Sequence, residues 1–278
     1  MTSHYQDTSL STIHQVVSGL GGDLQEGEAI WRFEQLTRLL KEGADPNEED
    51  AHDMTALAIL MDEHVPTNGQ VGVIAGDIVA TLIQSGANPL IKDRAIGKSD
   101  GSSLGMIMVE EVLIAHAKGR SIEDEEGGNL LHVLAEDDLD LLERVLRRKL
   151  FPASGRDQFQ LPTAWLTQHR TSTGDTPAHA LLSDDSIIIA RVENDMDADE
   201  YFPLAWECLR SFIALDVDLR TKNEEGVSIA NFIAEKVNTN VLPVDDDEVW
   251  GQIQSFATQD TLHKKTSKAH GKASSPRF

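Results

Sequence analysis

The sequence lacks the features of a disulfide-linked, secreted or membrane-spanning protein. Its 278 residues include a single cysteine, Cys208, so no disulfide can form within the chain. No apolar run approaches the roughly 20 residues that a bilayer-spanning helix needs. The first ten residues are polar and do not look like a secretory signal. We therefore expect a cytoplasmic protein with no membrane insertion.

Basic residues are also scarce. There are 24 lysines and arginines against 47 acids, which gives a net charge of −23. Five of the basic residues lie between Thr261 and Phe278, where there are no acids, so the rest of the chain is more acidic still. Such a body repels nucleic-acid phosphates and anionic membrane surfaces, and it favours basic proteins as partners. We expect no nucleic-acid binding by this acidic body.

The composition otherwise supports a folded core, because 40% of the residues are hydrophobic and 26% are charged. Beyond about residue 259 it changes to lysine, serine, histidine and glycine without apolar periodicity. We predict a folded domain over residues 1–258 and a basic, disordered tail over residues 259–278.

Apolar residues recur at helical spacing, and two such segments end in the same way. One is followed by Gly43-Ala44-Asp45-Pro46 and the other by Gly86-Ala87-Asn88-Pro89. In each ending the glycine suits the left-handed conformation after a helix, and the proline prevents the helix from continuing. A third segment, residues 206–215, is followed by Asp216 and lacks the glycine.

A second recurring pattern predicts where helices begin. In Gly174-Asp175-Thr176-Pro177-Ala178-His179, the threonine is suited to the N-cap and the proline to the first helical position. Weaker copies place Ser, Thr or Asn at the capping position. These capping residues are Thr55, Ser103, Asn129 and Ser228.

With these openings and endings in alternation, the chain resembles the ankyrin-repeat family, whose unit is a turn followed by two antiparallel helices. The resemblance implies an all-α, ankyrin-type helical-repeat solenoid of about five to six irregular repeats. Its capping positions are 48, 26, 47 and 52 residues apart, whereas the family period is about 33. We therefore predict insertions around residues 62–76, 151–173 and 183–202. The interval after Ser103 is too short for a complete repeat.

Terminal repeats are also expected. The apolar spacing over residues 10–20 predicts the first helix of an N-terminal repeat, and Val249, Ile253 and Phe256 predict a C-terminal one.

Several residues with chemical potential have structural interpretations. His132 and His179 occupy the histidine position of the opening motif, where the family uses the ring to tie the turn to the helices. Cys208 lies in an apolar helical pattern, which predicts a buried, inert thiol. Alternating acids at residues 195–199 resemble the start of a calcium loop, but Glu200 and Trp206 stand where that loop needs glycine and glutamate. We predict no metal site and no cofactor.

Acidic residues gather just before the helix openings, where ankyrin proteins have projecting turns called fingers. The resemblance implies that these acids line one edge of the concave partner-binding face. The candidate partner-binding residues are Glu48, Glu49, Asp50, Asp53, Glu123, Asp124, Glu125, Glu126, Asp175, Glu224 and Glu225.

The leading hypothesis is therefore a protein-binding module that recognises a basic protein partner through acidic fingers and the concave face. One alternative is an inhibitor or immunity-like protein that imitates nucleic acid and blocks a basic nuclease or DNA-binding protein. A second is a secreted effector whose repeats bind a host protein. Phosphate-binding glycine loops, zinc-binding cysteine pairs and Gly-x-Ser-x-Gly turns are missing from the sequence, and we do not expect an enzyme.

Overall fold

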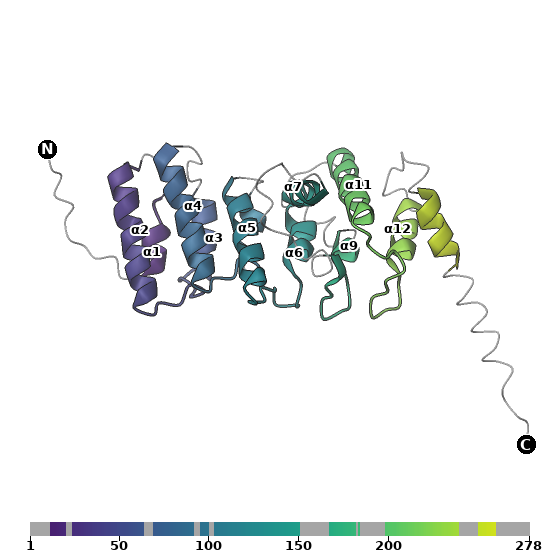
Figure 1. Ribbon diagram of the computed structural model, residues 1–278, viewed down its shortest axis with the longest axis horizontal. Coiled ribbons are helices and arrows are strands. Elements are labelled where there is room, and N and C mark those ends of the chain that lie inside the picture. Colours follow the sequence, from purple (N-terminus) through teal and green to yellow (C-terminus); the bar gives the residue numbers. More distant parts are fainter. Residues whose placement is uncertain are drawn as a thin grey trace, which may run out of the picture. The chain divides into compact units, whose positions relative to one another are not determined.

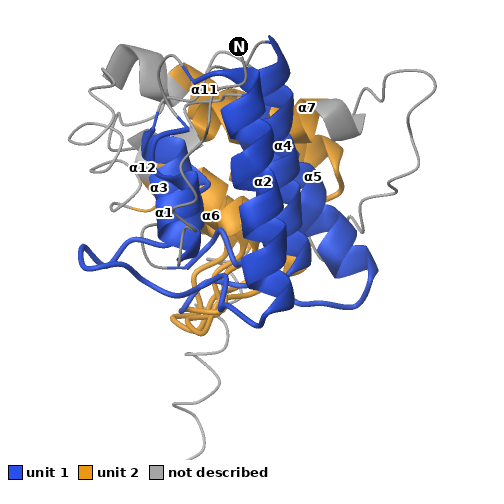
Figure 2. Ribbon diagram, turned by 90° about the vertical axis from the view of Figure 1, so that its left-hand side faces the viewer, with its two compact units in different colours: residues 1–125 blue, residues 126–278 orange. Residues whose placement is uncertain are grey.

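The computed structural model describes residues 12–20, 24–63, 69–91, 95–99, 103–150, 167–181, 183, 198–238 and 250–259. Over these ranges the regular structure is helical, with two isolated β-bridges in turns. This confirms the predicted all-α fold of repeated helix pairs. The chain divides into two compact units, Met1–Glu125 and Glu126–Phe278 (Figures 1 and 2). Of the predicted basic tail, residues 260–278 lie outside the described ranges.

Unit 1 has two layers of helices. Its elements are α1 (Ile13–Val17), α2 (Glu26–Lys41), α3 (Ala56–Asp62), α4 (Gly69–Gln84), the 3-10 helix η1 (Gly97–Ser99) and α5 (Ser103–Ala117). In one layer α1 packs on α3 and α3 on η1, and in the other α2 packs on α4 and α4 on α5 (blue in Figure 2). Each repeat therefore adds a short first helix to one layer and a longer second helix to the other.

The second helices of unit 1 end alike. Gly43, Gly86 and Gly119 follow α2, α4 and α5 with φ angles of 96°, 119° and 84°, in the left-handed region that favours glycine. The insertion predicted around residues 62–76 is partly wrong, because residues 69–76 form the first half of α4. Helices α2 and α4 have the same length of 16 residues, and residues 64–68 of the predicted insertion lie outside the described ranges.

The third repeat explains the short interval after Ser103. That residue begins α5, which packs on α4 and is a second helix. The place of the first helix is taken by η1, which packs on α3 next to the buried side chain of Ile96. The interval from Ser103 to Asn129 therefore contains one helix of a repeat and not two.

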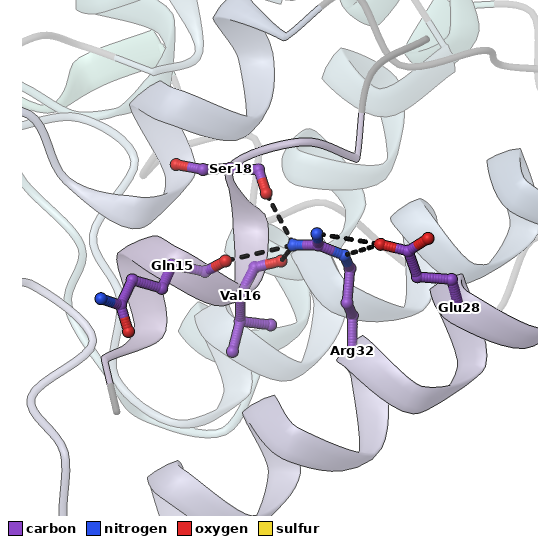
Figure 3. A network of polar contacts seen from close by, with 5 residues as sticks. All are labelled: Gln15, Val16, Ser18, Glu28 and Arg32. Carbon is purple, nitrogen blue, oxygen red and sulfur yellow. Dashed lines mark hydrogen bonds and ion pairs between the residues drawn. The ribbon is translucent and has the colours of Figure 1, made fainter. Parts of the chain in front are cut away.

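An arginine joins the first two helices of unit 1 (Figure 3). The Arg32 guanidinium donates hydrogen bonds to the carbonyl oxygens of Gln15, Val16 and Ser18 at 3.1, 3.0 and 2.6 Å. The same guanidinium donates to the Glu28 carboxylate at 3.1 and 3.2 Å. It thereby satisfies carbonyls at the end of α1 that have no partner within the helix.

Side-chain bonds also join successive helix endings in unit 1. The Asn88 amide nitrogen of the main chain donates to Asn47 Oδ1 at 2.8 Å. Asn88 Nδ2 then donates to the Glu123 carbonyl at 2.8 Å, and the Arg120 guanidinium donates to the Ala87 carbonyl at 3.0 Å. These bonds place the carboxyl ends of α2, α4 and α5 side by side, so the three helices run parallel.

Unit 2 repeats the plan with different lengths. Its elements are α6 (Leu130–Asp137), α7 (Leu139–Leu150), α9 (Pro177–Ala180), α11 (Ala198–Ala214), α12 (Ile229–Asn238) and a helix over residues 250–259. First helices pack on one another, α6 on α9 and α9 on α12, while the second helices α7 and α11 pack together. Each unit contains three repeats, each with a first and a second helix, where η1 takes the place of one first helix. The described residues therefore contain six repeats, which agrees with the predicted five to six.

Helix α11 bears on two sequence interpretations. The insertion predicted over residues 183–202 is wrong at residues 198–202, which are helical, and Asp195 and Asp197 of the calcium-loop pattern lie outside the described residues. Cys208 is fully buried in the same helix, and burial raises the pKa of its thiol. The predicted burial of this thiol is confirmed.

Candidate functional site

A turn of one construction precedes the helices α3, α9 and α12. Its first residue accepts a main-chain N–H with its side chain and donates its own N–H to the carbonyl of the fifth residue. The side-chain bonds are Met54 N to Asp50 Oδ1 at 3.1 Å, Asp175 N to Thr171 Oγ1 at 3.2 Å, and Val227 N to Asn223 Oδ1 at 3.0 Å. Because each turn satisfies its own main chain, it projects as a preformed loop.

The fourth residue is left-handed in each of these turns and in the turn over residues 124–128 that precedes α6. Gly127, Gly174 and Gly226 have φ angles of 80°, 77° and 75°, and Asp53 has 60°. At Gly174 space also demands glycine, because a Cβ atom there would lie 3.0 Å from the main-chain nitrogen of Glu224. The turns are therefore specified by conformation in both units, and by close packing at Gly174 in unit 2.

The sixth residue caps the helix that follows. Thr55 Oγ1 accepts from Ala58 N at 3.3 Å, Asn129 Oδ1 from Leu131 N at 3.0 Å, and Ser228 Oγ from Asn231 N at 3.3 Å. All of these caps are buried, as is Thr176. The predicted helix openings at Thr55, Asn129, Thr176 and Ser228 are confirmed.

The two histidines of the opening motif tie each turn to the next one. His132 Nδ1 accepts from its own cap, Asn129 N, at 3.1 Å, and Nε2 lies 3.0 Å from the Asp175 carbonyl. His179 Nδ1 accepts from Thr176 N at 3.2 Å, and Nε2 lies 3.4 Å from the Val227 carbonyl. Because Nδ1 accepts a main-chain N–H and Nε2 faces a carbonyl oxygen, this geometry favours the neutral ring with its proton on Nε2 in both residues. The predicted structural role is confirmed.

Burial favours that neutral form. It lowers the pKa of His132 from 6.5 to about 4, and it lowers the pKa of His179 as well. Protonation would put an N–H on Nδ1 against the main-chain N–H that this nitrogen accepts.

Main-chain bonds join the three turns of unit 2 edge to edge. Ser172 N donates to the Glu126 carbonyl at 2.8 Å, and Glu224 N donates to the Thr173 carbonyl at 3.1 Å. Asn223 Nδ2 donates to Asp175 Oδ1 at 2.9 Å. The positions of the turn tips relative to one another are fixed by these bonds and by the histidines.

Sequence reasoning did not identify two further ties. His169 Nε2 lies 2.8 Å from the Gly127 carbonyl, and the Arg170 guanidinium donates to the Lys222 carbonyl at 2.8 Å. Both residues lie in the predicted insertion over residues 151–173, where no periodic signal points to them.

The predicted partner-binding acids fall into two sets. Those exposed at the turns are Glu48, Asp53, Glu125, Glu126, Glu224 and Glu225. Those only half exposed are Glu49, Asp50, Glu123, Asp124 and Asp175. In this second set Asp50 accepts two main-chain N–H groups and Asp175 accepts from Thr173 Oγ1 and Asn223 Nδ2. The Asp50 bonds, the one from Met54 above all, lower the pKa of its carboxyl group. The carboxylates of the first set are therefore more exposed than those of the second.

First helices offer little surface beside these tips. Residues 56–60 of α3, residues 130–135 of α6 and all of α9 are buried. The turns, rather than the first helices, therefore present most of the accessible side chains on this side of each repeat.

The described ranges contain neither a candidate membrane-spanning helix nor a candidate metal site. Within them, no helix is long and apolar enough to cross a membrane. No group of three or more His, Cys, Asp or Glu side chains there is arranged to hold a metal ion.

Comparison with known proteins gives distant structural likenesses. No family model and no curated protein matches the chain. A chain of the solved complex of a predatory endopeptidase from Bdellovibrio bacteriovorus with an immunity protein is 15% identical, with a TM-score of 0.39 over 83% of this chain and 94% of that one. An ankyrin repeat protein from Leishmania major is 14% identical, with a TM-score of 0.36 over 81% of this chain and 77% of its own. At this level of similarity neither structure bears on what this chain binds.

Proposed function

We propose that this protein is a binding module without a catalytic step, and that the exposed acids of its turns recognise a basic segment of a protein partner. The observation that carries the proposal is the edge-to-edge bonding of the turns in unit 2. It holds Glu126, Glu224 and Glu225 on one preformed surface, so little conformational entropy is lost when a partner binds.

The charge of these tips is available to a partner. Glu224 and Glu225 are exposed, and neither makes an ion pair with another described residue. An exposed ion pair contributes only about 0 to 1 kcal/mol. Several acids must therefore act together, and their main effect is to steer a basic partner toward the turns and speed association.

The test uses three isosteric changes, Glu126→Gln, Glu224→Gln and Glu225→Gln, in one full-length variant. The partner is first captured by crosslinking to the wild-type protein, and association is then followed by stopped-flow kinetics at two salt concentrations. We expect the variant to bind several-fold more slowly at low salt and to lose most of its salt dependence. Its melting curve should be unchanged.

A variant with Glu224→Gln and Glu225→Gln alone removes two charges. Its matched control changes two exposed acids of unit 2 that lie on second helices, Asp140→Asn on α7 and Glu207→Gln on α11. This control should associate at the wild-type rate. Equal slowing of both variants would mean that net charge alone matters, and no slowing of either would place the contact elsewhere. Displacement of the captured partner by duplex DNA would favour the inhibitor that imitates nucleic acid.

A further inference from the structure

The second helices of unit 1 are in register with one another. The main-chain hydrogen bonds that follow each helix have the same pattern. In each case the N–H of the glycine donates to the carbonyl three residues earlier, at Leu40, Ile83 and His116. Gly43, Gly86 and Gly119 can therefore serve as reference points for equivalent positions on α2, α4 and α5. The ties between their carboxyl ends hold these positions level.

One level of this layer is apolar. Thirteen residues before each glycine stand Ile30, Val73 and Met106. Ile30 is 42% exposed and Val73 is 57% exposed, and these are the large hydrophobic residues exposed in the described part of the chain. Met106 is half exposed. Single exposed apolar residues are ordinary, but these three occupy the same position on adjacent helices and form a row.

A second level is acidic. Glu34, Asp77 and Glu110 follow the apolar residues by four positions, which is about one helical turn or 6 Å along each helix. Glu34 and Asp77 are exposed and Glu110 is half exposed. Unit 1 therefore presents an apolar row and, parallel to it, an acidic row across the same three helices.

The spacing within the rows suits an α-helix laid across the layer. Packed helices are about 8–10 Å apart, and residues seven apart on an α-helix are about 10.5 Å apart on one face. In an extended segment, residues about 10 Å apart are three apart and point to opposite sides. A helix can therefore place an apolar residue over each member of the row, and an extended strand cannot.

We propose that this surface of unit 1 binds an amphipathic helix of a partner protein, with apolar residues over Ile30, Val73 and Met106 and lysine or arginine over the acidic row. A second copy of this chain is a poorer occupant, because it would bring the same acidic row against this one. The surface is separate from the turns, so the partner helix adds a second contact to those proposed above.

The probe is a synthetic peptide of about 20 residues, with three leucines at every seventh position and a lysine four residues after each leucine. A peptide of the same composition in scrambled order is its control. Binding to the full chain is measured by fluorescence anisotropy. We expect the patterned peptide to bind and the scrambled one to bind at least about tenfold more weakly, because only the first matches both rows.

Three variants locate the peptide. Ile30→Gln with Val73→Gln should weaken binding about tenfold. Glu34→Gln, Asp77→Asn and Glu110→Gln together should remove the salt dependence. Ala117→Gln, an apolar-to-glutamine change at an exposed position of α5, should have no effect.

The outcomes of these experiments distinguish this proposal from the proposed binding of a partner by the turns. Equal binding of both peptides, or binding that is unchanged by the Ile30 and Val73 changes, would overturn it. Loss of peptide binding only in the Glu126, Glu224 and Glu225 variant would assign the peptide to the turns and also overturn it. If the Glu126, Glu224 and Glu225 variant associates with the captured partner at the wild-type rate, the proposed function of the turns fails, and the proposal for this surface is unaffected.

Discussion

The two units share a plan of turns and helix pairs but are held together by different side chains. In unit 1 the groups that join one repeat to the next are Asn47, Asn88 and Arg120, with the half-exposed His14, whose Nε2 lies 2.8 Å from the Glu48 carbonyl. In unit 2 buried histidines do much of this work. Ala58 stands three residues after its cap in unit 1, where unit 2 has His132 and His179. Stability should therefore respond to pH in one unit more than in the other.

The largest expected effect is acid destabilisation of unit 2. The folded-state pKa of His132 is lowered from 6.5 to about 4, so the unfolded chain binds the proton more readily. The stabilising contribution of the neutral His132 ring to the free energy of unfolding is complete above pH 6.5, and it is lost as the pH falls from 6.5 to about 4. The difference is about 3 kcal/mol in all, and roughly 2 kcal/mol by pH 5. His179 acts in the same direction. Hydrogen exchange, corrected for the intrinsic rates, should show unit 2 losing protection between pH 7 and pH 5.

Unit 1 provides the internal control for that measurement. The lowered pKa of Asp50 means that its stabilising contribution is lost only as the pH falls below 3.8, outside this window. Helices α2, α4 and α5 should therefore keep their protection at pH 5. An equal loss in both units would show that the histidines do not cause it.

The next effect comes from His132→Leu. This change puts an apolar side chain of similar size in place of the ring. It leaves the Asn129 N–H without its partner and removes one of the two hydrogen bonds that the Asp175 carbonyl accepts. We expect a loss of about 2 kcal/mol at pH 7. The variant should also lose much of the stability change between pH 7 and pH 5, since one of the titrating rings is gone. Urea denaturation followed by circular dichroism at the two pH values measures both. A full wild-type pH response would contradict the assignment to His132.

Asn88→Ala is the counterpart in unit 1. It removes the side-chain bonds that Asn88 makes with the Glu123 carbonyl and with Leu90 N. We expect a loss of about 1 to 2 kcal/mol. This loss should be equal at pH 7 and pH 5, because neither partner titrates there. The same denaturation experiment checks it, and a loss confined to one pH would show that unit 1 also depends on a titrating group.

Local patterns predicted the openings and endings of the helices, because caps and left-handed glycines act within a few residues. The capping positions at Thr55, Asn129, Thr176 and Ser228 are confirmed on this basis. The role of Ser103 was not predictable, because a serine before an apolar helix looks the same whether the helix is first or second in its repeat. The packing of α5 on α4 shows that α5 is a second helix.

The candidate site was predictable only in part, for a similar reason. The turn pattern shows that acids such as Asp50 and Glu126 lie in fingers, but it does not separate those used inside the turn from those at its tip. One of the hydrogen bonds that the Asp175 carboxylate accepts comes from Asn223, 48 residues away, which no local pattern contains. The apolar row on unit 1 likewise appears only once α2, α4 and α5 are placed in register.

The smallest expected effect compares the turns themselves. Asp53 has a φ of 60°, where the turns of unit 2 have glycine, and its side chain is exposed. A left-handed conformation is less costly for glycine than for aspartate, although glycine loses more entropy on folding. Asp53→Gly should therefore stabilise unit 1 by only about 0.5 kcal/mol.

The reverse change in unit 2 provides the matched comparison. Gly226 has a φ of 75°, and a Cβ atom at this position would meet nothing within 4 Å beyond its chain neighbours, so Gly226→Asp tests conformation alone. It should destabilise unit 2 by about 1 kcal/mol. Gly174→Asp adds a clash with the main chain at Glu224 and should cost more than Gly226→Asp. Chemical denaturation of the three variants at pH 7 ranks them. If Asp53→Gly destabilises the protein, the aspartate side chain contributes to its turn in a way that outweighs the strain at φ 60°.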